Sequence, residues 1–258
     1  MRLLLPLLLS GCAAHRIQAL EAENQLLRQE LAAANSRVAT LTAQGCGAGG
    51  VLGGQVGPPR MPPVDPEEAA KQEVEAMQAL LEARTLDDAG EGLAARAMYT
   101  RIVETWPTGR SAAVARRRVE ELAILGKPAP TPQVARWLEG KAPEATPMQI
   151  LVFWEVWCPH CQRELPELSA RADALKSQGI SVVAYTRLTK TSTAERVHEF
   201  YQTYDIRFPT ALEQADAMST AYVVSGIPAA AVVKDGVIIW RGHPARLTDE
   251  LIARLKGG

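Results

Sequence analysis

The stretch that decides the fold spans residues 153–161 and reads Phe153-Trp154-Glu155-Val156-Trp157-Cys158-Pro159-His160-Cys161. Two cysteines separated by two residues follow the apolar run Ile150 to Trp154, which predicts a buried strand. The residues after Cys158 predict a helix from Pro159 to Ser177, because proline is favoured at the first helical position. We therefore expect Cys158 at the N-terminus of this helix, where unpaired N–H groups and the helix dipole favour a thiolate.

This spacing predicts thiol–disulfide exchange in which the two cysteines have different roles. Cys158 is expected to attack, since a stabilised thiolate is attackable as a disulfide partner and leaves readily. Cys161, one helical turn later and more shielded, is expected to resolve the mixed disulfide. A protonated His160 would stabilise the Cys158 thiolate further. No cofactor is expected beyond the redox-active disulfide Cys158–Cys161.

Other uses of the cysteine pair are disfavoured. A zinc site needs four ligands, often from two such pairs, and the chain has only one. His15, His198 and His243 do not cluster in sequence with the pair. Copper delivery usually uses three residues between the cysteines rather than two. A purely structural disulfide is disfavoured because so small a loop is usually redox-labile. No metal ligand is therefore assigned.

The surrounding sequence alternates predicted strands and helices, which indicates an α/β sheet with helices on both faces. A β-hairpin is expected across Asp235-Gly236, a dipeptide typical of two-residue hairpin turns. The other predicted elements are a strand over 180–186, helices over 193–204 and 215–222, hairpin strands over 229–233 and 237–241, and a closing helix over 247–255.

Residues 127 to 256 resemble the TlpA/ResA branch of the thioredoxin superfamily, whose members are envelope-anchored thiol–disulfide oxidoreductases. The matching segments are Gly126-Lys127-Pro128-Ala129-Pro130, Phe153-Trp154, Trp157-Cys158, Glu164-Leu165-Pro166, Tyr222, Gly226-Ile227-Pro228, Asp235-Gly236 and Trp240-Arg241-Gly242. The resemblance implies a thioredoxin-like domain over 127–258 at the C-terminus.

The resemblance also implies supporting residues at the site. Pro228 matches the family's cis-proline, with Ile227 before it, and would help bind the substrate chain; an ordinary trans turn is the alternative. Glu164 matches an acidic residue that tunes the thiols, and would exchange a proton with Cys161 if partly buried. An exposed carboxylate that suits the helix dipole is the alternative for Glu164. Trp157 is expected to cover one flank.

Two departures leave the direction of electron flow open. Thioredoxin has a buried Asp six residues before its first cysteine, whereas this chain has Val152 there. The dipeptide Pro159-His160 is found in strongly oxidising DsbA-type enzymes, and it indicates a more oxidising potential than that of thioredoxin. The scaffold therefore favours a reductase, and the dipeptide favours an oxidase.

The N-terminus is interpreted as a lipoprotein signal peptide over residues 1–11. Met1-Arg2 supplies a positive charge, and the apolar run Leu3 to Leu9 is too short to span a bilayer. The small residues before Cys12 resemble the lipobox of bacterial lipoproteins, which implies that Cys12 carries lipid and anchors the chain in the envelope, facing the periplasm. An ordinary signal peptide with a coincidental cysteine is the alternative.

Residues 12–44 are predicted to form the lipid anchor and a coiled-coil stalk. A seven-residue apolar repeat runs through residues 15–43, with Asn24 at one core position, and favours a homo-oligomer over a single surface helix. Residues 45–66 are a Gly/Pro-rich linker. Its Cys46 is either a cross-link between chains or inert.

Residues 67–126 are predicted to be all-helical and to resemble one tetratricopeptide helix–turn–helix; a small spacer packed on the next domain is the alternative. Three helices are expected, over 67–84, 90–105 and 111–125. Their inward apolar residues are predicted to be Val74, Met77, Leu80, Leu81, Leu93, Ala97, Ile102, Val103, Val114, Val119, Leu122 and Leu125.

Overall, the chain is predicted to be an anchored enzyme that acts on protein thiols and disulfides of the envelope. The alternative is a redox-silent scaffold lipoprotein that uses its coiled coil and helical segment for interactions. The chain has 28 Lys and Arg against 29 Asp and Glu, so its charge gives no indication of nucleic-acid binding.

Overall fold

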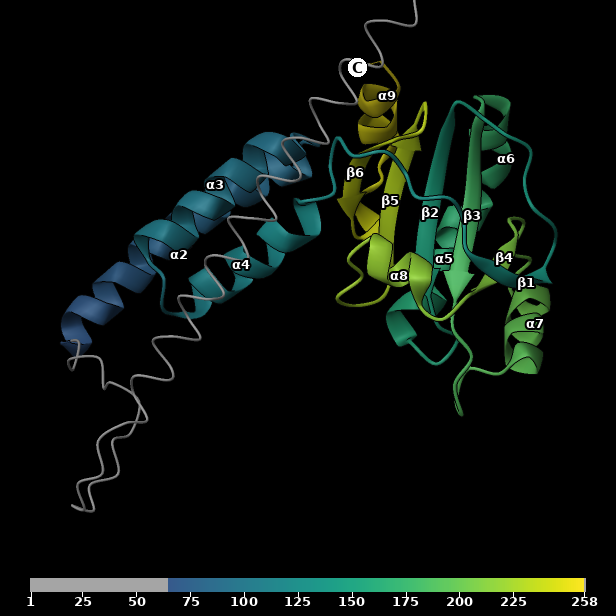
Figure 1. The fold of residues 1–258 in the computed structure, drawn as a ribbon, viewed down its shortest axis with the longest axis horizontal. Coiled ribbons are helices and arrows are strands. Elements are labelled where there is room, and N and C mark those ends of the chain that lie inside the picture. Colours follow the sequence, from purple (N-terminus) through teal and green to yellow (C-terminus); the bar gives the residue numbers. More distant parts are fainter. Residues whose placement is uncertain (1–64, 258) are drawn as a thin grey trace, which may run out of the picture. The chain divides into compact units, whose positions relative to one another are not determined.

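The computed structural model describes residues 65–257, and its elements carry the labels of Figure 1. The predicted signal peptide, Cys12, the coiled coil over 15–43 and Cys46 lie outside these residues. The described elements are α2 (Pro66–Asp88), α3 (Gly92–Thr105), α4 (Arg110–Leu122), β1 (Val134–Glu139), β2 (Met148–Trp154), α5 (Pro159–Ala170), α6 (Ala172–Ser177), β3 (Ile180–Thr186), α7 (Ala194–Thr203), β4 (Thr210–Glu213), α8 (Ala217–Ala221), β5 (Ala229–Lys234), β6 (Val237–Gly242), the 3-10 turn η1 (Pro244–Arg246) and α9 (Asp249–Gly257).

Within residues 65–257, no helix is both long and apolar enough to cross a membrane. The six strands found in the described part of the chain form one mixed sheet in the order β1-β4-β3-β2-β5-β6. Strands β2, β3 and β4 run parallel, whereas β5 pairs antiparallel with β2, β6 with β5, and β1 with β4 (Figure 1). This sheet and its helices confirm the predicted α/β class.

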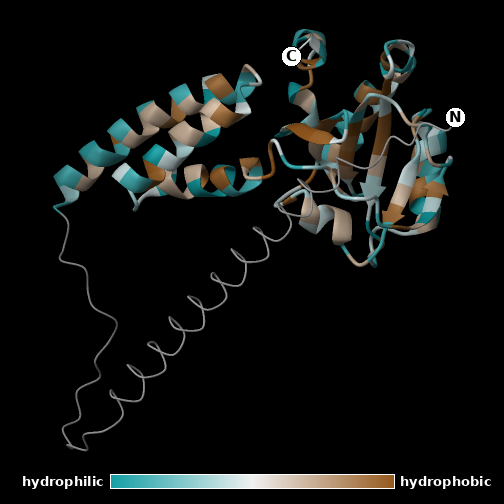
Figure 2. Cartoon of the chain, turned by 45° about the horizontal axis from the view of Figure 1, so that its top comes forward, coloured by the Kyte–Doolittle hydropathy of each residue, from teal (hydrophilic) through white to brown (hydrophobic). Residues whose placement is uncertain are grey.

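Strand β2 lies at the centre of the sheet and contributes to two cores. Successive side chains of a strand point to opposite faces. Ile150, Val152 and Trp154 therefore pack in one buried cluster with residues of α5, α7 and α9. Leu151 and Phe153 pack in the other, with residues of α8 and of the N-terminal helices. Burial on both faces explains why β2 is apolar at every position except Gln149, and Figure 2 shows the hydrophobic character of the interior strands.

The predicted hairpin is present between β5 and β6. Its turn residues Asp235 and Gly236 both have positive φ angles, 49° and 77°. Two consecutive residues in this region match the twist of the strands they connect, and Asp-Gly adopts it at low cost. The sequence prediction at this turn is confirmed.

Strands β1 and β4 are absent from the sequence-based assignment. The four residues of β4 follow Pro209 and are too few to show a period. Strand β1 is an edge strand that pairs only with β4, and its exposed Arg136 interrupts the apolar pattern. The single helix predicted over 159–177 is also wrong, because the chain breaks at Arg171 into α5 and α6.

Helices α2, α3 and α4 pack on one another and share a buried cluster with the sheet. Tyr99 and Leu122 belong to the same cluster as Leu151 and Phe153 of β2. The turn between α3 and α4 includes Gly109, whose φ of 101° is accessible to glycine. The structure therefore joins the helical segment directly to the C-terminal sheet.

The predicted inward faces of these helices are partly wrong. Leu80, Ile102, Leu122 and Leu125 are buried as expected. Between 43% and 64% of the surface is exposed at Val74, Met77, Leu81, Leu93 and Val114. The helices instead meet through alanines that are fully buried, namely Ala76, Ala83, Ala95, Ala112 and Ala115. Short side chains at the contact allow close helix packing, so the large apolar residues point elsewhere.

Candidate active site

Cys158 lies at the N-cap of α5, immediately before Pro159. Its backbone is extended, with φ −80° and ψ 115°, and its Sγ accepts a hydrogen bond from the backbone N–H of Cys161 over 3.5 Å. This is the position predicted from the sequence. The amide N–H directed at the sulfur and the positive end of the helix dipole both lie at Cys158.

Cys161 lies one turn further along α5 in an apolar environment. Its exposed fraction is 0%, against 4% for Cys158, and both thiols are free. Burial is the largest cause that raises the pKa of Cys161, and the neighbouring Cys158 and the Glu155 carboxylate raise it further. A hydrogen bond with the Glu155 backbone opposes this shift. Cys161 is therefore held in its protonated form, as suits a resolving thiol that reacts second.

The loop before β5 faces Cys158. The Ile227–Pro228 peptide bond is cis, as expected from the resemblance, and Pro228 is buried. The carbonyl of Ile227 accepts the Cys158 thiol hydrogen, with a sulfur–oxygen distance of 3.7 Å. A backbone carbonyl at this distance from the attacking sulfur is available to an extended chain bound at the same place.

Glu155 is a buried acid of the site that the sequence does not single out. Its exposed fraction is 3%. One carboxylate oxygen accepts the indole N–H of Trp157 at 2.6 Å, and the other accepts Arg187 at 2.7 Å. Val152 leaves thioredoxin's usual acid position apolar, yet Glu155 supplies a carboxylate from the end of the same strand. The sequence feature that could have identified Glu155 is an acidic residue directly after the apolar run Ile150 to Trp154.

Trp157 lies at the surface beside Cys158 and is 46% exposed. Because its indole N–H is held by Glu155, the ring has a fixed orientation. The Glu155–Arg187 ion pair has one buried partner, with side-chain exposures of 4% and 42%. The half-buried Glu155–Arg187 ion pair therefore supports the orientation of Trp157, whose role at the flank of the site stays a prediction.

Glu164 is buried, with 5% exposure, and its carboxylate accepts two hydrogen bonds from the adjacent Arg163 at 3.1 and 3.0 Å. The exposed His160 lies on the same surface, and its Nδ1 is 3.3 Å from Arg163. Burial of Glu164 is the condition under which it is expected to exchange a proton with Cys161. The alternative of an exposed first-turn carboxylate is not what the structure shows.

His243 joins this group from the end of β6, although it is remote in sequence. Burial is the largest cause that lowers its pKa; the negative charge of Glu164 opposes this shift, and His160 adds to it. Its Nδ1 accepts the backbone N–H of Ala245 at 3.2 Å. Only the three-dimensional fold brings His243 toward α5. Within residues 65–257, no three His, Cys, Asp or Glu side chains form a metal-binding group.

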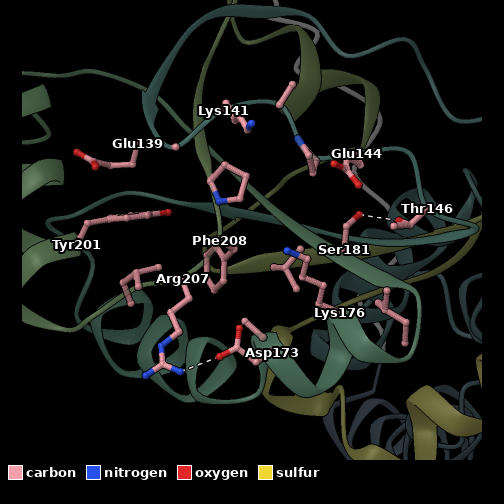
Figure 3. Close-up of a pocket in the computed structure, with 18 of the residues that line it drawn as sticks. Glu139, Lys141, Glu144, Thr146, Asp173, Lys176, Ser181, Tyr201, Arg207 and Phe208 are labelled. Carbon is pink, nitrogen blue, oxygen red and sulfur yellow. Dashed lines mark hydrogen bonds and ion pairs between the residues drawn. The ribbon is translucent and has the colours of Figure 1, made fainter.

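A separate cavity of about 490 Å³ lies at the other end of the sheet, where β2 and β3 begin. Figure 3 shows it between Tyr201, Phe208 and Ser181, with Arg207 paired to Asp173 at the rim. The cysteines follow the end of β2, so this cavity is not part of their site.

Comparison with known proteins identifies the family. The AhpC/TSA family model matches residues 144–241. The thiol-disulfide oxidoreductase ResA of Bacillus thuringiensis subsp. konkukian (strain 97-27) is 31% identical over 142 residues, which are 53% of this chain and 80% of that protein. The chain belongs to the ResA family of thiol-disulfide oxidoreductases.

Other similar proteins include the sporulation thiol-disulfide oxidoreductase A of Bacillus subtilis (strain 168), 29% identical over 79 residues that make up 31% of this chain and 48% of that protein. The crystal structure of StoA from Bacillus subtilis has 24% identity and a TM-score of 0.42, covering 50% of this chain and 98% of that chain. The mixed sheet and its helices form the thioredoxin-like fold expected from the sequence, and the match to ResA shows that the chain is a thiol-disulfide oxidoreductase.

Proposed function

We propose that this ResA-family chain exchanges electrons with protein thiols and disulfides through Cys158 and Cys161. One observation carries the proposal: Cys158 begins α5 with its sulfur against the Ile227 carbonyl, and Cys161 is buried directly behind it. Cys158 is the more exposed of two buried thiols, at 4% against 0%, and it lies beside the cis-proline loop, so we assign the first attack to Cys158 and the second to Cys161. The reaction needs this asymmetry.

Reduction of a client disulfide proceeds in two displacements. The Cys158 thiolate attacks one client sulfur, the client S–S bond breaks, and its second sulfur leaves as a thiolate. Cys161 then loses its proton and attacks the Cys158 sulfur, which closes the Cys158–Cys161 disulfide and releases the first client thiolate. Two electrons have passed to the client. The same steps in reverse oxidise a client dithiol.

The supporting residues act on these two steps. Glu164 would accept the Cys161 proton in the second displacement, since it is buried and lies one turn further along the same helix. Ile227 and Pro228 would align the client backbone opposite Cys158. His160 and Pro159 would stabilise the Cys158 thiolate, and Trp157 would bound the site on the solvent side.

The chain would act while anchored. Lipid on Cys12 would hold it in the bacterial envelope facing the periplasm, and the repeat over 15–43 would make it a homo-oligomer. Residues 45–66 would then form the flexible part of the tether between anchor and enzyme. Clients would be envelope proteins within reach of the membrane.

A redox titration of the full chain against glutathione buffers tests the exchange, with alkylation of the two thiols as the readout. We expect one reversible two-electron transition. A potential near about −120 mV, as in DsbA, assigns an oxidant, and one near about −270 mV, as in thioredoxin, assigns a reductant. Absence of any transition, with no exchange toward a test disulfide, would identify a redox-silent scaffold instead.

A further inference from the structure

A groove of about 520 Å³ separates helices α2 and α4 from the loops that carry Pro228 and His243. It begins where the cysteine site ends, because Ile227 lines the groove and its carbonyl accepts the Cys158 thiol hydrogen. His243 lines the groove as well, and the charges of Glu164 and His160 affect its pKa. A chain bound along Pro228 would therefore continue toward the helical segment.

Helix α4 contacts the loop that leads into the cis peptide. Arg117 donates from Nε to the Ser225 hydroxyl at 2.9 Å, and Ser225 in turn donates to Glu121 of α4. The guanidinium of Arg117 also lies over Gly226, with a nitrogen 3.0 Å from where a Cβ would be. The helical segment thus forms one wall of the space beside the cis-proline.

The groove carries an excess of positive charge. Five arginines line it against two aspartates and one glutamate, so the difference is two positive charges with His243 neutral. Each of the three acids is already paired with at least one arginine. Arg84 and Arg241 have no acidic partner within 4.0 Å among the described residues.

These two arginines differ in their surroundings. Arg84 is exposed at the rim on α2. Arg241 is 3% exposed and donates to the backbone carbonyls of Tyr222, Val223 and Gly242. Burial lowers the pKa of Arg241 to about 10, so it remains charged at neutral pH. Carbonyl groups satisfy its hydrogen bonds without cancelling its charge.

We propose that this groove docks the client segment that flanks the exchanging cysteine, and that it selects segments bearing carboxylate side chains. The proposal rests on the exchange reaction at Cys158 proposed above. Guanidinium groups bind carboxylates through paired, charge-assisted hydrogen bonds. Charge complementarity also accelerates encounter. The helical segment then contributes to client choice rather than serving only as a spacer.

The test uses the full chain in its reduced form and three matched peptides with one disulfide each, flanked by acidic, neutral or basic residues. The measurement is the second-order rate constant of peptide reduction. We expect the acidic peptide to react about tenfold faster than the basic one at low salt, and the ratio to fall toward one at high salt, where exposed charges are screened. Equal rates for the acidic and basic peptides would overturn the docking proposal.

Arg84→Glu should reduce the acidic-over-basic ratio by about fivefold or more, since it reverses an exposed charge at the rim. Arg101→Glu is the matched control, because Arg101 is an exposed arginine of α3 outside the groove. An equal decrease of the acidic-over-basic ratio in Arg84→Glu and Arg101→Glu would also overturn the proposal. Reduction of the neutral peptide tests the exchange itself; if no peptide reacts, both the exchange and the docking fail.

Discussion

At the scale of single residues, Cys158 and Cys161 share one motif but differ in their surroundings. Cys158 receives a backbone N–H at a helix N-terminus and lies against the Ile227 carbonyl, whereas Cys161 lies one turn further along α5 and is fully buried; both border the same apolar core. This difference follows from the spacing and was predictable from it. The buried carboxylate of Glu155 was not, because its position beside Cys161 depends on how the chain turns after β2.

Glu155→Gln should shift the resolving step toward lower pH. The substitution keeps the volume and removes a negative charge that helps raise the pKa of Cys161, although burial remains the largest cause. More thiolate forms at neutral pH, but each thiolate is a weaker nucleophile, so release of a mixed disulfide should accelerate only about twofold. Stopped-flow release of a fluorescent peptide as a function of pH measures this.

Glu167→Gln is the control for that experiment, since Glu167 is an exposed acid of α5. The rate of peptide release as a function of pH should be the same in Glu167→Gln as in the unmodified chain. A Glu155→Gln profile that also overlays that of the unmodified chain would show that the carboxylate charge does not reach Cys161.

Glu164→Gln should slow the resolving step at neutral pH by about a hundredfold, because a positioned proton acceptor typically contributes that much or more. The first displacement by Cys158 should change far less. Single-turnover kinetics separate the two phases, with Glu167→Gln again as the matched control. If both phases slow equally, Glu164 acts on the structure of α5 rather than on proton transfer.

At the scale of helices and strands, the apolar strands β2 and β3 and the Asp-Gly hairpin follow from local sequence. β1 and β4 do not, because a short strand or an edge strand can be polar and still pair. The predicted inward faces of α2, α3 and α4 are partly wrong for a related reason: alanines can make the contact between helices, so the large apolar residues need not.

An ion-pair cluster joins the helical segment to the sheet domain. Asp87 of α2 has a side chain only 4% exposed and is bound by Arg118 at 2.7 Å and by Arg246 at 3.3 Å. Burial alone would raise the pKa of Asp87, but its hydrogen bonds and ion pairs with these arginines outweigh burial and hold the pKa below its ordinary value. The cluster therefore stabilises the folded state when Asp87 is charged.

Asp87→Asn should lower the free energy of unfolding by about 3 kcal/mol at neutral pH, because it leaves Arg118 partly buried without its main counter-ion. Because the folded-state pKa is depressed, the stabilisation is present above the ordinary value of 3.8 and disappears as the pH falls through the lower folded value. Denaturant unfolding of the full chain at several pH values measures both effects.

The exposed Asp88, whose side chain is 65% accessible, offers the control Asp88→Asn, which should cost less than about 1 kcal/mol. Two results would contradict the stabilising role of this cluster. One is a similar loss in the free energy of unfolding for both variants, and the other is a loss in Asp87→Asn that persists in strong acid.

At the scale of the whole molecule, the C-terminal family was predictable from sequence because its motifs recur at fixed spacing around the cysteines. The groove between α4 and the cis-proline loop was not, because it depends on packing between segments more than 100 residues apart, such as Arg117 and Ser225. Long-range packing of this kind leaves no local periodicity to detect.

Anchoring through Cys12 is tested by Cys12→Ser in the full chain. The lipid cannot attach to serine, so the protein should move from the membrane fraction to the soluble fraction, because acyl chains supply about 0.8 kcal/mol per buried CH₂ group. Cys46→Ser is the matched control and should stay with the membrane. Unchanged fractionation of Cys12→Ser would count against the lipid anchor.

The central claim is that Cys158 forms the mixed disulfide with the client and Cys161 releases it. The most direct measurement is trapping with a disulfide peptide in the full chain carrying Cys46→Ser, with the adduct located by mass spectrometry. Cys161→Ser should accumulate the peptide on Cys158, and Cys158→Ser should give no more than about a tenth of that yield. Peptide attached to Cys161, or equal yields from both variants, would contradict this assignment.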